Sequence, residues 1–176
     1  MLLIQERMKP NTALTRFSDR RSQNFARHPV PPLLHDPAVR DSILARVRKL
    51  APDTEHQWGK MTVDQMLWHV SRSLAQSLGQ IPSMPNRVPV PKWLSKLVAF
   101  NFPWPKGTPT PPDLVAVDHY VFEDERRRCL QLIDAFTAKD LNEAWPPSAS
   151  FGPLTGREWS RFQAKHLDHH LRQFAV

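Results

Sequence analysis

Two of the eight histidines, His166 and His170, lie four residues apart near the end of the chain. In a helix this spacing separates the two side chains by about 40°, so both imidazoles lie on one face and can bind one metal ion. His169 points about 100° away from His170 and is a poorer partner. The shared face is otherwise mostly apolar. Burying two bare imidazoles there costs free energy, which either a metal ion or a buried carboxylate would offset.

A third ligand has to come from a facing helix, and His69 is the candidate because it lies in the middle of a predicted helix. It belongs to a polar stripe with Gln65, Ser73 and Gln76, which suits a wet pocket beside a helical core. The other histidines lie in loops or near the N-terminus: His28, His35, His56 and His119. The zinc-protease motif is absent, since Leu167 occupies the position of its glutamate. Spacing alone leaves structural or surface histidines as the alternative to a metal site.

Four long helices must position these residues. The first begins at Asp36-Pro37, a side-chain cap followed by proline at the first helical position, and ends before Ala51-Pro52. The second follows a capping box at Thr62 and ends near Gly79. The others are expected at about 122–138 and from a second capping box at Thr155 to about 174. A short helix is expected at 93–100.

These elements predict an all-α fold, an antiparallel four-helix bundle over residues 36–176. Residues 81–113 hold nine prolines and form a long crossover between the second and third long helices. No strand pattern of useful length, no glycine-rich phosphate loop and no repeat interrupts this arrangement.

Composition excludes several classes of protein. A chain of 176 residues fits one domain with a tail, and a single cysteine excludes an intrachain disulfide. No window approaches 18 uncharged apolar residues, and the first residues lack the features of a secretory signal. We therefore expect no membrane partner and a cytoplasmic location.

The positive charge is concentrated near the N-terminus. Residues 1–35 carry six basic and two acidic residues, a net +4, which leaves +3 of the total of +7 for residues 36–176. This pattern predicts a basic, extended or disordered N-terminal arm over 1–35. Because the rest of the chain is only mildly basic, a solvated arm is favoured over nucleic-acid binding.

Two histidine motifs lie on predicted helices: Met66-Leu-Trp-His69-Val70 on an early helix and His166-Leu-Asp-His169-His170-Leu-Arg-Gln173 on the last. Together they resemble the DinB/YfiT-like superfamily, whose late pattern H-x-x-H-H-x-x-Q the second motif fits. Three further stretches resemble an uncharacterised branch of that superfamily: Trp58-Gly-Lys-Met61, Trp104-Pro-Lys-Gly107 and Phe151-Gly-Pro-Leu-Thr-Gly-Arg-Glu-Trp159. The resemblance covers about 36–176. It implies a four-helix bundle whose metal ligands are His69, His166 and His170.

Three imidazoles leave coordination positions open, as in catalytic rather than structural zinc sites, and zinc, nickel, iron and manganese all accept imidazole. An open metal lowers the pKa of a bound water, binds a thiolate or polarises a carbonyl. The resemblance implies a transferase that uses a metal-activated low-molecular-weight thiol on a small-molecule substrate. Metal-dependent hydrolysis and a non-catalytic metal-binding or ligand-binding module remain alternatives, so enzymatic activity itself stays open. The resemblance is also compatible with a homodimer.

Other candidate residues have simpler interpretations. Cys129 lies on an apolar helix face and is expected to be a buried, inert thiol. Asp168 points away from both late ligands and is expected to be exposed. His169 is expected at the surface, with contact to a metal ligand as its alternative. Gln173 shares the face of His166 and either hydrogen-bonds a ligand or packs. The tryptophans next to loops either pack or line a pocket: Trp58, Trp104, Trp145 and Trp159.

Overall fold

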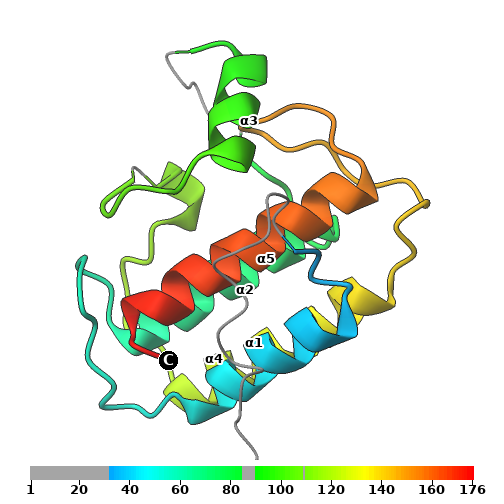
Figure 1. Cartoon of the computed structure of the whole chain (residues 1–176). Coiled ribbons are helices and arrows are strands. Elements are labelled where there is room, and N and C mark those ends of the chain that lie inside the picture. Colours follow the sequence, from blue (N-terminus) through cyan, green and yellow to red (C-terminus); the bar gives the residue numbers. More distant parts are fainter. Residues whose placement is uncertain (1–31, 85–89, 109) are drawn as a thin grey trace, which may run out of the picture.

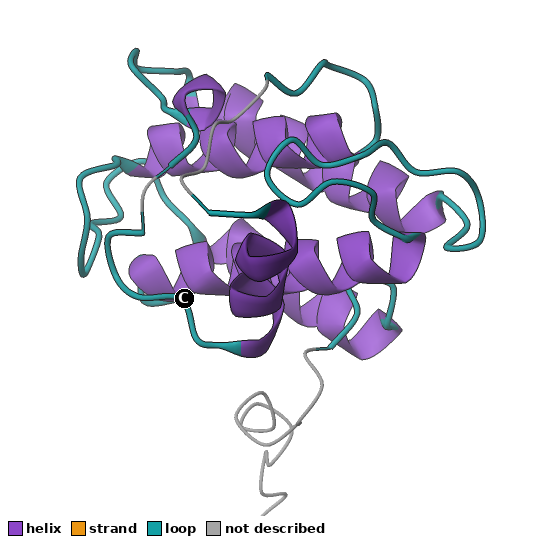
Figure 2. Cartoon of the chain, turned by 90° about the horizontal axis from the view of Figure 1, so that it is seen from above, coloured by secondary structure: helices purple, strands orange, loops and turns teal. Residues whose placement is uncertain are grey.

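The computed structural model describes residues 32–84, 90–108 and 110–176. These residues form five α-helices and a short 3-10 helix: α1 (Pro37–Lys49), α2 (Val63–Ser77), α3 (Lys92–Asn101), η2 (Pro112–Leu114), α4 (Phe122–Ala138) and α5 (Gly156–Gln173). Within them there is no strand, and the prediction of an all-α fold is confirmed (Figure 2).

Local sequence signals account for the helix ends. The Asp36 carboxylate accepts a hydrogen bond from the Ala38 backbone N–H at 3.0 Å, which caps α1. In the second capping box, the Thr155 hydroxyl accepts from the Glu158 N–H while the Glu158 carboxylate accepts from the Thr155 N–H. Gly79 follows α2 with a φ of +74°, a conformation that glycine adopts without strain.

The four long helices pack in a closed arrangement, in which α1 and α2 each contact both α4 and α5. Figure 1 shows α1 and α5 running in one direction and α2 and α4 in the other. The predicted antiparallel packing therefore holds for α1 with α4 and for α2 with α5. The pairs α1–α5 and α2–α4 are parallel, because the crossover returns the chain to the starting end of α2 before α4 begins. There the Asp64 carboxylate accepts from the Tyr120 N–H at 2.9 Å.

The core of these four helices is apolar. Its fully buried side chains include Ile43, Leu67, Leu74, Ile133, Phe136 and Leu167. Two described residues of the predicted arm already belong to this packing: Leu34 is fully buried, and His35 Nδ1 lies 2.9 Å from the Ser160 hydroxyl. Residues 1–31 of the predicted arm lie outside the described residues. None of the described helices is both long enough and apolar enough to cross a membrane.

The crossover places α3 on the outside of α5 (Figure 1). The Lys165 ammonium group on α5 donates to the Ala99 and Phe102 carbonyls at 2.6 and 2.5 Å. These carbonyls end α3, so a cation there also interacts favourably with the helix dipole. Trp104 follows α3, and its indole N–H donates to the Ala99 carbonyl at 2.8 Å. These bonds fix Trp104 over α5, where its ring lies 5.8 Å from that of His166.

Candidate metal centre

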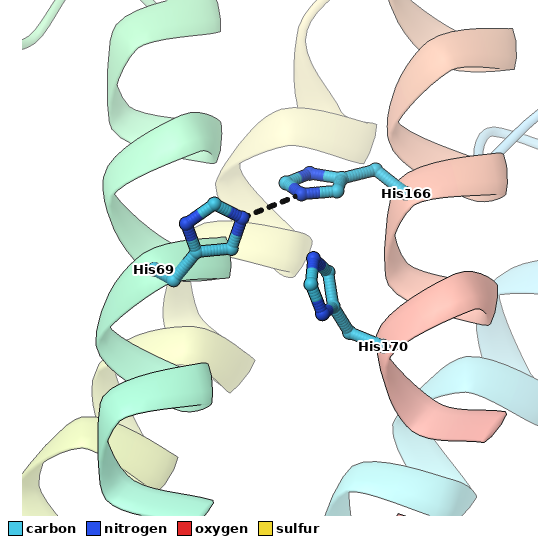
Figure 3. A group of neighbouring side chains, drawn as sticks. All are labelled: His69, His166 and His170. Carbon is cyan, nitrogen blue, oxygen red and sulfur yellow. Dashed lines mark hydrogen bonds between the residues drawn. The ribbon is translucent and has the colours of Figure 1, made fainter. Parts of the chain in front are cut away.

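Three histidine side chains from α2 and α5 converge inside the helical core. Figure 3 shows His69 on α2 pointing toward His166 and His170 on α5. The Nε2 atoms of His69 and His166 are 2.9 Å apart, and one nitrogen from each of the three rings lies within 4.8 Å of the others. All three residues are buried. The structure thus brings together all three of the residues that the sequence singles out.

The orientation of His69 is fixed by the crossover. Its Nδ1 lies 2.8 Å from the Leu114 carbonyl oxygen, at the end of η2. A carbonyl only accepts hydrogen bonds, so Nδ1 carries the proton and donates it. In a neutral ring the other nitrogen, Nε2, then presents a bare lone pair to the centre of the site.

His170 is held in the same tautomer by Gln173. The His170 Nδ1–H donates to Gln173 Oε1 at 2.9 Å, and the Gln173 amide NH₂ donates to the Trp58 carbonyl at 2.7 Å. The second bond fixes which end of the amide faces His170, because only the nitrogen can donate to a carbonyl. Gly59 makes room for this arrangement: a Cβ at its position would lie 2.5 Å from Gln173 Nε2.

Burial keeps all three rings neutral. Desolvation lowers the pKa of His69, lowers that of His166 further, and lowers that of His170 to about 3. The neighbouring imidazoles contribute in the same direction. Neutral imidazole is the form that binds a metal ion, so the site is in its ligating state at neutral pH.

The donor set fits a cation. Among the described residues no carboxylate joins the three histidines, which leaves the carboxylate alternative without support. His166 Nδ1 is buried without a hydrogen-bond partner in that part of the chain. His69 Nε2 lies 2.9 Å from His166 Nε2 and, being bare, accepts a hydrogen bond from it in the metal-free chain. A cation bound by both nitrogens would take the place of that proton. His69, His166 and His170 are therefore the residues that could hold a metal ion.

The other sequence candidates lie around this centre. His169 is half-buried, between the rings of Trp58 and Trp104 at 6.1 and 5.7 Å. Asp168 is half-buried rather than exposed as expected, because Arg46 of α1 and Arg172 reach its carboxylate at 2.8 and 3.0 Å. Cys129 is fully buried, and burial raises the pKa of its thiol to about 12, as expected for an inert thiol.

A pocket of about 520 Å³ lies beside the three histidines, between α5 and the crossover. Its lining includes His69, His166 and His170 as well as Trp104 and Trp159, so two of the four tryptophans line the pocket. The carbonyls of Leu114 and Trp58, which orient two of the histidines, were not predicted from the sequence. Backbone carbonyls have no signature in residue type, so no sequence signal points to them.

Comparison of the sequence with known protein families identifies the class of protein to which this helical fold and three-histidine centre belong. The model of the DinB superfamily matches residues 37–174, and the chain belongs to this superfamily. Searches of the curated proteins and of the solved structures gave no match.

Proposed function

We propose that the chain binds a divalent transition metal (zinc, nickel, iron or manganese) through His69, His166 and His170. We further propose that it transfers a low-molecular-weight thiol to a small electrophilic substrate. The observation that carries the proposal is the set of three buried, neutral imidazoles, two with Nε2 bared by a fixed tautomer, beside a pocket. Three protein ligands leave positions for an exogenous ligand, as in catalytic sites.

A metal in this site would lower the pKa of a bound thiol and so supply a thiolate at neutral pH. Hydrolysis by an activated water is often assisted by a general base, for which the described lining offers Asp113 and His169. Asp113 is the only carboxylate among the described lining residues. It accepts from the Gln76 amide at 2.6 Å and from the Met84 N–H at 3.1 Å, so it is held by two donors.

The thiol has to come from outside the chain. Cys129 is the only cysteine, and it is fully buried with a pKa of about 12. In the proposed reaction the thiol loses its proton to solvent, a carbon–sulfur bond forms, and the leaving group departs with its bonding electron pair. Because this chemistry requires reduced thiols, we propose a reducing compartment such as the cytoplasm.

The test starts with elemental analysis of the purified protein, followed by a transfer assay. The assay offers 1-chloro-2,4-dinitrobenzene with a panel of thiols, such as glutathione, cysteine and coenzyme A, before and after treatment with a chelator. We expect thioether formation that is lost on chelation and in His166→Ala. His119→Ala is the matched control, because that histidine is exposed and lies away from the three ligands.

The alternatives give different results in the same assay. Metal-dependent cleavage of an ester without added thiol would identify a hydrolase. Stoichiometric metal without either activity would identify a non-catalytic binding module. Thioether formation that is unaffected by chelation and by His166→Ala would overturn the proposed role of the metal.

A further inference from the structure

Apolar side chains make up most of the surface of the pocket beside the metal centre. They come from α3, α5, the crossover, η2 and the loop before α5, and include Leu94, Val98, Leu114, Trp104, Phe151 and Phe162. The three histidines form a polar part of the lining, and a few serine and threonine hydroxyls, such as that of Ser95 on α3, interrupt the apolar walls. A molecule in this pocket would therefore contact apolar groups over most of its surface, with one end at the histidines.

Within the described chain, the lining offers a ligand no cationic side chain, and its one carboxylate is that of Asp113. None of its residues in the described part of the chain is lysine or arginine. The nearby Lys165 ammonium group is turned away toward the carbonyls that end α3, and Lys106 lies over the Trp58 ring at 4.6 Å. The Asp113 carboxylate is already held by two donors. An ionised group inside the pocket would be desolvated without a partner, which is costly.

From this lining we infer that the pocket binds the electrophile, and that it selects an uncharged, hydrophobic molecule. The inference rests on the proposed function for the reaction, but the binding preference stands on the lining alone. Cellular thiols such as glutathione carry ionised groups, so the lining, which offers no cationic side chain within the described chain, fits the electrophile rather than the thiol. The cavity of about 520 Å³ is in the range of sites for drug-sized ligands.

Two fluorescent probes that share a naphthylamine body test this preference. N-phenyl-1-naphthylamine is uncharged, and 1-anilinonaphthalene-8-sulfonate carries a sulfonate. Binding is measured by titration with the full chain treated with chelator, so that the sulfonate cannot bind a metal. We expect the uncharged probe to bind at least tenfold more tightly. Equal affinity, or tighter binding of the sulfonate, would overturn the inference.

A pair of variants on α3 locates the binding. Val98 and Leu97 are neighbours with 50% and 48% exposure, and only Val98 lines the pocket. Val98→Lys places a cation at the pocket wall, so we expect it to weaken the uncharged probe at least fivefold and to tighten the sulfonate. Leu97→Lys should change neither. Because both side chains are half-exposed, neither change should unfold the chain, and circular dichroism checks this.

If Val98→Lys changes neither probe, or if Leu97→Lys acts in the same way, the probes bind elsewhere and the inference fails. The proposed function is judged by separate measurements. Removal of the metal with chelator should abolish thioether formation, while the metal-free chain still binds the uncharged probe within threefold of the metal-loaded chain. If thiol transfer is intact but the uncharged probe is not preferred, only the inference about the pocket is contradicted. If thiol transfer does not depend on the metal, only the proposed function is contradicted.

Discussion

Replacing Gln173 by methionine should lower metal affinity without removing any of the three histidines. Methionine has a similar length but cannot accept the proton of His170 Nδ1, which Gln173 Oε1 now accepts at 2.9 Å. His170 would lose the bond that fixes its tautomer and the direction of its ring. Loss of such a bond to a metal-bound histidine typically costs about 10–100-fold in metal affinity, or about 1.4–2.7 kcal/mol. We expect zinc affinity to fall within this range.

Gln163→Met is the matched control. Gln163 lies on the same helix and is equally buried, but its amide donates to the carbonyl and hydroxyl of Ser73 at 3.1 Å. Both variants leave buried polar groups unpaired, so each should lose about 1–3 kcal/mol of stability. Only Gln173→Met should also lose metal affinity. Competition with a chromogenic zinc chelator measures the affinity, and urea unfolding of the metal-free protein measures the stability.

A pair of glycine variants tests the position of Gln173 from the loop that contacts its side chain. Gly59 and Gly107 have φ angles of +90° and +79°, so alanine strains the backbone at both positions. A Cβ at Gly59 would collide with Gln173 Nε2, whereas a Cβ at Gly107 meets nothing within 4 Å. Gly59→Ala should therefore lower zinc affinity and Gly107→Ala should not. If Gln173→Met and Gly59→Ala both bind zinc as tightly as the unmodified chain, Gln173 does not position His170.

Three further predictions concern the same site. His166→Ala should abolish zinc binding yet keep the helical circular dichroism signal, because the apolar core packs without the ion. Collapse of that signal when the metal is removed with chelator would contradict this. With a pKa of about 3, His170 stays neutral at pH 5.5, where an unshifted histidine would be about nine-tenths protonated. Calorimetric zinc affinity should therefore change less than twofold between pH 7.5 and 5.5. The stability of the metal-free protein should fall as pH drops from 6.5 toward 3. Over this range the site histidines take up protons in the unfolded state, whereas in the folded state their lowered pKa keeps them neutral. Deleting residues 171–176 removes three buried side chains, those of Leu171, Gln173 and Phe174, and frays the helix around His170. Zinc affinity should therefore fall at least tenfold, while the 32–176 form should bind zinc like the full chain. Equal zinc affinity of both truncated forms would refute this.

The helices could be predicted from sequence because their signals are local. Asp36-Pro37 and the capping box at Thr155 fix where α1 and α5 begin, and the structure begins both helices there. The spacing of apolar residues also gives the buried faces, such as Ile43 and Val47 on α1. The relative directions of packed helices could not be predicted from the sequence. They depend on which helices become neighbours, and the paths of the long loops decide that. The parallel α2–α4 pair follows from the path of the crossover, whose many prolines show where helices stop but not where the chain goes.

The site could be predicted in part for the same reason. His166 and His170 share a face by helical geometry, and outside the last helix His69 was the only histidine placed in the middle of a helix. Their burial and convergence depend on the packing of α2 against α5, which the family resemblance implied and spacing alone could not decide. The surroundings of Asp168 were predicted wrongly because helical spacing gives the angle of a side chain on its own helix. It does not show that Arg46 of α1 lies opposite.

The loops contribute to this site in a different way from the helices. α2 and α5 bring three imidazoles to one place, yet an imidazole can turn either nitrogen toward a metal. At His69 the Leu114 carbonyl of the crossover makes that choice, and at His170 the Trp58 carbonyl of the α1–α2 loop makes it through Gln173. The same crossover carries α3 and Trp104, which wall the pocket. The crossover and η2 thus shape the pocket and orient His69, while the α1–α2 loop orients His170. Changes in the path of the crossover and η2 should therefore alter metal affinity and ligand preference together while the four long helices stay folded.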